Sequence, residues 1–329
     1  MIYIETGRAD IRWNLALEYY FTAEKDIGEE EIFLFWTTQP ALIIGKFQNA
    51  MEEIDLNYAR EKGIRVVRRL SGGGTIYADD GNWMFTFITR GDTDNICFQK
   101  YTMPILEALR GMGVDATFNG RNDLVIDGKK FSGNAQYKMA GKTVHHGTLM
   151  LNMNVEQMVR STMVDDQKIL SKSIKSVRDR VTNVSEYLPQ KMDSMEFKRR
   201  MVDAVMGKER REYVLTPEDQ ARIGEIAETK FDGWDIIFGA TPKFSIERVG
   251  RLPGGRMCFS MEIKRGCIER CGVSGDFFGT VDAAAFDRAL RGCPYRRADV
   301  EQALLNGGLE NAVMGISVKE MAAIIADQE

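Results

Sequence analysis

The fold is decided by a stretch of sequence that runs Arg68-Arg69-Leu70-Ser71-Gly72-Gly73-Gly74-Thr75-Ile76-Tyr77. The β-branched segment Ile64–Val67 leads into it, and the apolar segment Trp83–Phe87 follows it after Asp79-Asp80-Gly81-Asn82. Glycines have no Cβ, so backbone N–H groups can approach a ligand closely and form a concave anion site. Arginine suits such a site because its planar fork binds phosphate or carboxylate through two hydrogen bonds. The stretch therefore predicts either an anion-binding loop between two strands or a plain turn.

Two common nucleotide-binding motifs are incomplete in this chain. Gly141-Lys142-Thr143 resembles the end of a P-loop, but Gln136 stands where the first glycine belongs. Gly111-x-Gly113-x-x-Ala116 has the spacing of a dinucleotide fingerprint, but a helical pattern over residues 101–110 precedes it where a strand is required. Neither motif is therefore assigned to nucleotide binding.

Length and charge indicate an ordinary globular protein. The 329 residues correspond to about two domains, and the net charge of −4 argues against a broad nucleic-acid surface. No apolar run approaches the length of a membrane span, and Met1–Glu5 lacks the shape of a signal peptide. We expect a protein that binds neither nucleic acid nor a membrane.

The cysteines indicate a reducing compartment. Their number is odd and they are scattered, which favours free thiols in a cytoplasmic protein. Cys267 and Cys271 are the only close pair, and no second pair or nearby histidine completes a zinc site. No metal is predicted there.

Hydrophobic periodicity predicts alternating helices and strands, and so an α/β (α+β) fold. We expect helices over residues 14–25, 54–62, 95–111, 194–206, 217–230, 281–291, 297–305 and 317–327. We expect strands over residues 32–36, 41–44, 114–118, 123–126, 130–137, 142–153, 244–249 and 257–264. The polar and basic residues 172–180 predict a mobile loop. Gly239–Pro242 is the best linker, which divides the chain into domains 1–243 and 244–329.

The two histidines of the chain, His145 and His146, are adjacent and precede Gly147. Neighbouring residues of a strand point to opposite faces, so only one histidine can face a given pocket. The alternative is one surface histidine and one hydrogen-bonded core histidine. No serine, histidine and acid in a convincing order predict a hydrolytic triad.

A predicted hairpin brings further polar residues together. Asp127-Gly128 is a strong hairpin signal between the strands that carry Asn122-Asp123 and Lys130. These side chains could meet over one face of the sheet, or they could be solvated turn residues.

The ordered set of motifs resembles the lipoate–protein ligase A family over essentially the whole chain. The motifs are Arg69-x-Ser71-Gly72-Gly73-Gly74, Asp80-Gly81-Asn82, Gly120-Arg121-Asn122-Asp123, Lys130-x-Ser132-Gly133-x-Ala135, His145-His146-Gly147-Thr148-Leu149, Ser176-Val177-Arg178-x-Arg180-Val181-Thr182-Asn183, Trp234-x-x-x-Phe238-Gly239-x-Thr241-Pro242-x-Phe244 and Gly275-Asp276-Phe277-Phe278-Gly279. The resemblance implies a large mixed-sheet catalytic domain of the biotin/lipoyl ligase type and a smaller α+β C-terminal domain. It also implies activation of lipoate by ATP and Mg²⁺ to lipoyl-AMP, and then transfer of the lipoyl group to a carrier lysine.

The resemblance assigns roles residue by residue. Lys130 would lie between the carboxylate and the α-phosphate, as an electrostatic catalyst that stays charged. The nucleotide side would comprise Arg69, Gly74, Thr75, Ile76, Tyr77, Asn122 and Asp123. The acyl side would comprise Ser71, Gly72, Gly73, Ser132, Gly133, His146 and Gly147. No metal ligands are assigned, although Asp123 is a candidate, and residues 172–180 would cover the adenylate.

The family also implies partners and alternatives. The carriers would be lipoyl domains of 2-oxoacid dehydrogenases or the glycine-cleavage H protein, and the ligase would be a monomer. One alternative is an octanoyl or lipoyl transferase that uses Cys97 as its nucleophile. Another is a module that binds lipoate or lipoyl-AMP without turnover. Biotin ligases share the catalytic fold, but their Gly-Arg-Gly-x-x-Gly signature is absent from the sequence.

Overall fold

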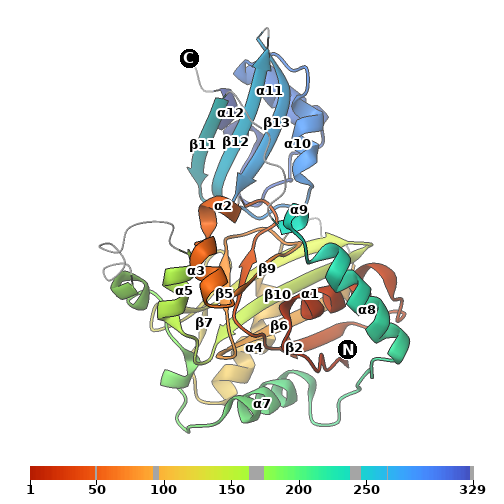
Figure 1. The fold of residues 1–329 in the computed structure, drawn as a ribbon, viewed down its shortest axis with the longest axis vertical. Helices are drawn as coiled ribbons and strands as arrows, with labels where there is room; N and C mark the ends of the chain where they lie inside the picture. The colour runs from red at the N-terminus through yellow and green to blue at the C-terminus, as the bar shows by residue number, and fades with distance from the viewer. Residues whose placement is uncertain (49, 92–95, 163–173, 238–245, 265, 327–329) are drawn as a thin grey trace.

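The larger part of the protein is organised by a seven-stranded mixed sheet (Figure 1). The computed structural model describes residues 1–48, 50–91, 96–162, 174–237, 246–264 and 266–326. The sheet order is β1 (Ile2–Tyr3), β2 (Ile32–Trp36), β6 (Asn82–Arg90), β10 (Lys142–Met150), β9 (Lys129–Met139), β8 (Asp123–Ile126) and β7 (Thr117–Asn119). Only the β1–β2 pair is parallel among these neighbours.

Helices cover both faces of this sheet, which explains the uninterrupted apolar sequence of β2. Ile32, Leu34 and Trp36 pack in the cluster that contains α1 (Ile11–Tyr19) and α8 (Pro217–Lys230). Phe33 and Phe35 point the other way, toward α4 (Gln99–Gly111) and α7 (Ser194–Met206). A strand buried on both faces needs apolar residues at every position rather than at alternate ones.

The glycine-rich stretch lies on a second, three-stranded sheet. Its order is β4 (Arg65–Arg68), β3 (Ala41–Ile44) and β5 (Ile76–Ala78), with β3 parallel to β4 and antiparallel to β5. The stretch joins two strands, but the second is β5, which was not predicted, and the predicted strand Trp83–Phe87 lies in β6 of the large sheet. Helices α2 (Ala50–Glu53), α3 (Leu56–Glu61) and α5 (Val155–Thr162) supply side chains that pack against the outer face of β3.

The hairpin predicted at Asp127-Gly128 is confirmed. Both residues have positive φ angles, 49° and 74°, which is the backbone of a tight two-residue β-turn. The predicted loop over residues 172–180 is wrong for 174–178, which are helical, because the local basic sequence still allows a helical turn. The rest of that loop up to residue 173, and the predicted linker within 238–245, lie outside the described residues.

A separate body forms from the C-terminal part of the chain (Figure 1). It contains an antiparallel sheet of β11 (Ile246–Leu252), β12 (Gly255–Lys264) and β13 (Cys267–Gly275). Helices α10 (Ala283–Leu290), α11 (Arg297–Asn306) and α12 (Val318–Ala326) pack on one face of it around a core of their own. The predicted fold class, a large mixed sheet followed by a smaller α+β body, is confirmed. The predicted domain boundary at 243/244 lies outside the described residues.

The remaining described helices are short. The first helix continues into the π-helical turn η1 (Tyr20–Glu24), η2 (Val184–Glu186) is a 3₁₀ turn, and α9 (Trp234–Ile237) precedes the C-terminal body. Across the described part of the chain, none of the helices combines the length and the apolarity that crossing a membrane requires.

A buried carboxylate joins α8 to the N-terminal helix. Asp219 accepts hydrogen bonds from the hydroxyls of Tyr20 and Tyr213, both at 2.7 Å, and from Lys25 Nζ at 2.9 Å. It also completes a capping box with Thr216 at the start of α8. Burial alone would raise the pKa of Asp219, but the donors from Tyr20, Tyr213 and Lys25 hold that pKa below its usual range.

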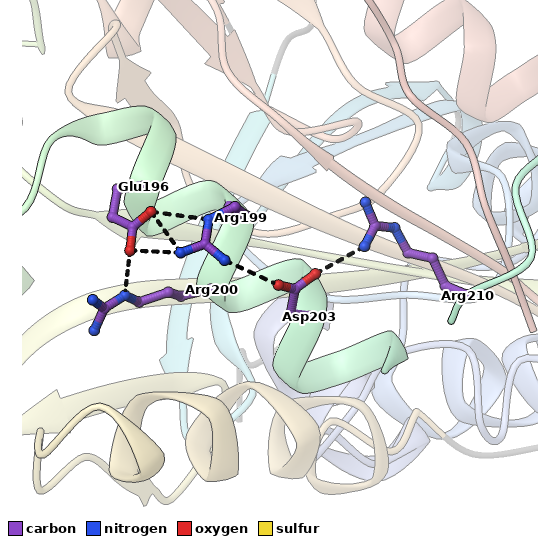
Figure 2. Close-up of polar contacts among 5 residues, drawn as sticks. All are labelled: Glu196, Arg199, Arg200, Asp203 and Arg210. Carbon is purple, nitrogen blue, oxygen red and sulfur yellow. Dashed lines mark hydrogen bonds and ion pairs between the residues drawn. The ribbon is translucent and has the colours of Figure 1, made fainter. Parts of the chain in front are cut away.

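A second charged network lies on the surface of α7 (Figure 2). Glu196 accepts from Arg199 at 2.8 Å and from Arg200 at 2.6 Å. Asp203, about two turns beyond Glu196, accepts from Arg199 at 3.4 Å and from Arg210 at 2.8 Å. Exposed pairs of this kind are screened by salt and contribute little to stability.

We expect Asp219→Asn to lower the free energy of unfolding by about 2 kcal/mol, because a charged acceptor of several buried hydrogen bonds is lost. The folded pKa of Asp219 is depressed, so its stabilisation is present above the unfolded pKa of about 3.9 and is lost as the pH falls below it. Urea unfolding between pH 7 and pH 3 measures the free energy of unfolding as a function of pH. The variant should lose less stability on acidification than the native protein.

Glu196→Gln is the matched control on the exposed network. Its smaller effect should disappear in 1 M salt, whereas the effect of Asp219→Asn should persist. Equal salt sensitivity of the two variants would contradict the assignment of Asp219 as the buried connection.

Candidate functional site

The glycine-rich loop, residues 69–75, is held together by a buried arginine. The Arg69 side chain, with the residue only 6% exposed, donates to Ser71 Oγ at 3.0 Å and to the carbonyl of Ile43 at 2.9 Å. Its Nη2 also donates to the carbonyls of Gly72 and Gly74, at 2.7 and 2.8 Å. Burial lowers the pKa of Arg69 to about 10, which leaves the guanidinium charged at neutral pH. Four of the five N–H donors of an arginine are thus used within the chain.

Arg68 holds the neighbouring backbone in the same way. Its guanidinium donates to the carbonyls of Gly45 at 2.9 Å, of Gln48 at 2.7 Å and of Ile237 at 3.0 Å. The two arginines were predicted as part of an anion site, and in this structure both bind backbone carbonyls instead. Phosphate binding by Arg69 therefore stays a prediction.

A chain of buried hydrogen bonds connects the loop to α1. Ser71 Oγ lies 2.7 Å from His146 Nε2, and His146 Nδ1 lies 3.0 Å from Glu18 Oε2. The other oxygen of Glu18 accepts from Thr86 Oγ1 at 2.5 Å. Because the Glu18 carboxylate can only accept, His146 Nδ1 carries a hydrogen, and in the neutral ring Nε2 then accepts the hydrogen of Ser71 Oγ.

This serine–histidine–glutamate order has the connectivity of a hydrolytic triad, which the sequence did not reveal. Ser71 is almost fully buried and does not line either of the two cavities beside the loop. Its hydroxyl also accepts a hydrogen bond from a cation, which opposes its activation as a nucleophile. The arrangement fixes the position of the glycine-rich loop.

His145 points into the core on the other face of β10, as the alternation predicted. Gln136 Nε2 donates to the carbonyl of Cys97 at 2.6 Å and to His145 Nδ1 at 3.1 Å, so Nδ1 is an acceptor. His145 Nε2 consequently donates to Asn134 Oδ1 at 3.2 Å. Burial, with the nearby His146, holds the pKa of His145 well below its usual range.

Two cavities meet beside this loop. The larger, of about 630 Å³, has an apolar wall of Met150, Met153, Met158, Val159, Val177 and Val181, with Arg180 and Ser176 on its rim. The smaller, of about 130 Å³, has Leu15, Trp36, Ile43 and Met84 in its apolar part and Asn122, Asn134 and His146 among its polar groups. Both cavities are lined by Thr75, Ile76, Lys130, Gly133 and Thr148.

Lys130 lies in the wall that the cavities share. Its side chain is 43% exposed, and Nζ forms an ion pair with Asp123 Oδ1 at 2.7 Å. The register of β8 and β9 shifts between Lys130 and Ser132, so Phe131 forms a bulge that changes the direction of the strand. The backbone of Lys130 also bonds to Arg180 and Thr182, which brings the chain after residue 174 against the larger cavity.

Glycines occupy two positions beside Lys130. A Cβ on Gly133 would lie 3.3 Å from Lys130 Nζ, so its absence leaves room for the lysine side chain. A Cβ on Gly147 would lie 2.3 Å from both Asn134 Oδ1 and the Phe85 ring. Glycine is therefore required at position 147 by close packing, while at position 133 it gives the flexible lysine side chain room.

The structure brings most of the predicted site residues together. Those lining the smaller cavity are Arg69, Gly74, Thr75, Ile76, Asn122, Lys130, Gly133, His146 and Gly147. Those lining the larger cavity are Thr75, Ile76, Tyr77, Lys130 and Gly133. Among the described residues, those outside both linings are Ser71, Gly72, Gly73, Asp123 and Ser132.

Several residues of the site were missed from the sequence. Glu18 could have been noticed as an acid within an apolar helical pattern, whereas Thr148 and Phe278 stood in the quoted motifs but were given no role. Cys97 lies two residues before α4 and lines neither described cavity. The geometry therefore gives no support to Cys97 as a nucleophile. No group of three or more histidine, cysteine or acidic side chains within the described ranges is arranged to hold a metal ion.

Comparisons with known proteins agree on one family. A family model described as the lipoyl protein ligase A/B catalytic domain matches residues 10–206. A second model, the bacterial lipoate protein ligase C-terminus, matches residues 241–325.

Relatives match over the full length. Lipoate-protein ligase LplJ of Bacillus subtilis is 40% identical, over 99% of this chain and 100% of the relative. Lipoate–protein ligase 1 of Staphylococcus aureus is 40% identical, over 88% of this chain and 89% of its own.

Solved structures show the same fold. One of P. falciparum LipL1 with lipoate has a TM-score of 0.81 over 99% of both chains, at 21% identity. Another, of a bi-partite lipoate protein ligase and its lipoyl domain from Thermoplasma acidophilum, has a TM-score of 0.66 at 26% identity, over 74% of this chain and 98% of that chain.

The hydrogen-bond chains predict that the two adjacent histidines are opposite tautomers, His145 with its hydrogen on Nε2 and His146 on Nδ1. Nitrogen-15 NMR of the histidine rings measures this directly, since the chain has only two histidines. Glu18→Gln should cost about 2 kcal/mol of stability, because a buried charged acceptor is lost, while its amide oxygen still accepts from Nδ1 and keeps the tautomer of His146.

Glu225→Gln, which removes an exposed carboxylate paired with Arg222, is the control and should change neither property. Native histidines with the same tautomer would contradict the hydrogen-bond assignment.

Proposed function

The chain belongs to the lipoate–protein ligase family, and we propose that its two cavities hold lipoate and ATP on either side of Lys130. In the proposed first step, a carboxylate oxygen of lipoate bonds to the α-phosphorus, the bond from that phosphorus to the bridging oxygen breaks, and pyrophosphate leaves. The single observation that carries this proposal is that Lys130 lines both cavities.

The smaller cavity suits an acyl chain that ends in a carboxylate. Its walls Leu15, Trp36, Ile43 and Met84 are buried and apolar, so they can remove an apolar tail from water. Lys130 and Asn122 provide a cation and an amide on the same lining. A lipoate with its carboxylate at Lys130 would satisfy both kinds of lining at once.

The larger cavity suits a nucleotide. Its methionines and valines offer an apolar surface for a base, and methionine adapts its shape to flat rings. Lys130 and Arg180 supply positive charge toward the shared wall. ATP with its α-phosphate at Lys130 would therefore face the lipoate carboxylate, and Thr75 and Tyr77 would flank it.

Lys130 would act by charge and position. Two anions repel each other, at about 4 kcal/mol for unit charges 4 Å apart near a protein surface. An ammonium group between them offsets this repulsion and holds the reacting atoms close. The side chain keeps its proton throughout, and Asp123 orients it through the ion pair.

Magnesium fits this site only as an ion held mainly by phosphate oxygens and water, which is the usual arrangement for Mg²⁺. Asp123, which pairs with Lys130, is the candidate carboxylate, and the described residues offer no cluster of acids there. When bound, the ion would neutralise charge on the departing pyrophosphate.

In the proposed second step, the amine of a carrier lysine attacks the acyl carbonyl. A C–N bond forms, the bond from carbon to the AMP oxygen breaks, and the amine loses a proton. The carrier lysine is the nucleophile, so the enzyme needs no cysteine. We propose lipoyl domains of 2-oxoacid dehydrogenases and the glycine-cleavage H protein as carriers, with the ligase a cytoplasmic monomer. The lipoyl domain solved with the Thermoplasma ligase supports the first of these.

We expect Lys130→Ala to lower lipoate-dependent ATP–pyrophosphate exchange at least about 100-fold, because the charge between the two anions is lost. Exchange of labelled pyrophosphate into ATP measures the first step without a carrier. Lys129→Ala is the matched control, since adjacent residues of β9 point to opposite faces, and it should retain most of the activity.

Cys97→Ala distinguishes the ligase from the transferase and should leave exchange unchanged. Absence of exchange in the native protein, combined with acyl transfer from a carrier that requires Cys97, would contradict the proposed function. Lipoate binding without exchange or transfer would identify a non-catalytic binder.

A further inference from the structure

The C-terminal body reaches the smaller cavity through the loop Gly275–Gly279. Two adjacent phenylalanines of this loop point in opposite directions. Phe277 is buried in the C-terminal core, where its ring stacks on Phe47 at 4.5 Å between centroids. Phe278 instead joins a cluster with Phe98 and Ala135 of the larger body.

Phe278 is enclosed by residues of the larger body. It is 3% exposed, its ring packs edge-on against Phe98 at 5.3 Å, and the Arg121 guanidinium lies 5.0 Å from its centroid. It lines the smaller cavity together with Lys130 and Asn122. Among the described residues that line this cavity, Phe278 is the one that comes from the C-terminal body.

The contact with this loop leaves no room for a side chain at Gly72 or Gly73. A Cβ on Gly73 would lie 2.6 Å from Phe278 Cε1, and a Cβ on Gly72 would lie 2.4 Å from the carbonyl oxygen of Phe277. Gly73 has a φ of +89°, and its N–H donates to that carbonyl at 2.8 Å. This N–H therefore forms a hydrogen bond between the two bodies. The absence of side chains at Gly72 and Gly73 makes room for the C-terminal loop.

Arg121 fixes the same loop from the other side. Its Nη2 donates to the carbonyl of Gly254, and to that of Asp276 at 3.4 Å. Burial lowers the pKa of Arg121 although Asp276 and Asp123 lie near it. Arg121 directly precedes Asn122, so the segment that lines the cavity also holds the C-terminal loop.

We propose that Phe278 forms one wall of the acyl pocket, so that the C-terminal body completes the lipoate site, and that its ring, together with the positive φ, requires glycine at position 73. The inference rests on the proposed function and adds a residue that determines how the acyl substrate is bound. Phe278 lines the smaller cavity and not the larger one, so its effect is expected on lipoate and not on ATP.

The test measures ATP–pyrophosphate exchange with lipoate and ATP varied separately. Phe278→Leu should raise the KM for lipoate about tenfold, because part of an apolar pocket wall is lost. The KM for ATP should stay the same. Phe278→Met, whose flexible side chain adapts to an irregular space, gives a second reading should the leucine variant be unstable, and it should shift the same constant in the same direction.

Phe286→Leu is the matched control. It removes the same volume from the C-terminal core, where Phe286 packs against Phe259, and should leave both KM values unchanged. If it raises the KM for lipoate as much as Phe278→Leu does, the effect belongs to C-terminal stability, and the proposal is overturned.

A double variant tests the contact itself. Gly73→Ala should impair exchange strongly, because the new methyl group collides with the Phe278 ring. Combined with Phe278→Ala, its effect should be smaller than the product of the two separate effects, since the colliding ring is gone. If the effects of Gly73→Ala and Phe278→Ala on exchange simply multiply, the proposal that Phe278 forms a wall of the acyl pocket is refuted. Equal changes in the KM values for lipoate and ATP in Phe278→Leu would refute it as well. Absence of exchange in the native protein would instead refute the proposed function.

Discussion

One charged side chain, that of Lys130, lies in the wall shared by the two cavities, and the surrounding structure serves to place it there. The bulge at Phe131 redirects the strand, and Gly133 leaves space for the ammonium group. Asp123 pairs with it at 2.7 Å, and the chain around Arg180 and Thr182 bonds to its backbone. A cation fixed between two sites can bring two anions together without an energetic cost of reorganisation at the moment of reaction.

The second layer of the site consists of buried polar groups that are almost all used within the chain. Arg69 donates hydrogen bonds to carbonyls of the glycine-rich loop. Hydrogen bonds through Ser71, His146 and Glu18 connect that loop to α1. Such groups are costly to bury unless their hydrogen bonds are made. Here the bonds join segments far apart in the sequence, so the loop that borders both cavities has a defined position.

Local patterns in the sequence predicted much of this structure. The apolar run Ile32–Trp36, the Asp127-Gly128 turn and α7 and α8 follow from periodicity, turn chemistry and capping. The order of the motifs placed Lys130 correctly beside the glycine-rich loop and the histidine strand. These features depend on neighbours in sequence, or on a family pattern that preserves their order.

Features that depend on tertiary partners could not be predicted. Glu18 pairs with His146, which is 128 residues away, and no local signal connects them. The hydrogen bonds of Arg69 to the carbonyls of Ile43, Gly72 and Gly74 also depend on the folded loop, and its predicted phosphate binding stays a prediction. The role of Gly73 depends on Phe278, and strand β13 was missed because Glu269 and Arg270 interrupt its apolar alternation.

The most direct measurement is a crystal structure with a stable analogue of lipoyl-AMP, in which a sulfamoyl group replaces the phosphate. The account predicts the lipoyl chain in the smaller cavity, the adenosine in the larger one, and the linking group within about 3 Å of Lys130 Nζ. An analogue bound with both ends in one cavity, or with its linking group away from Lys130, would contradict the central role of this lysine.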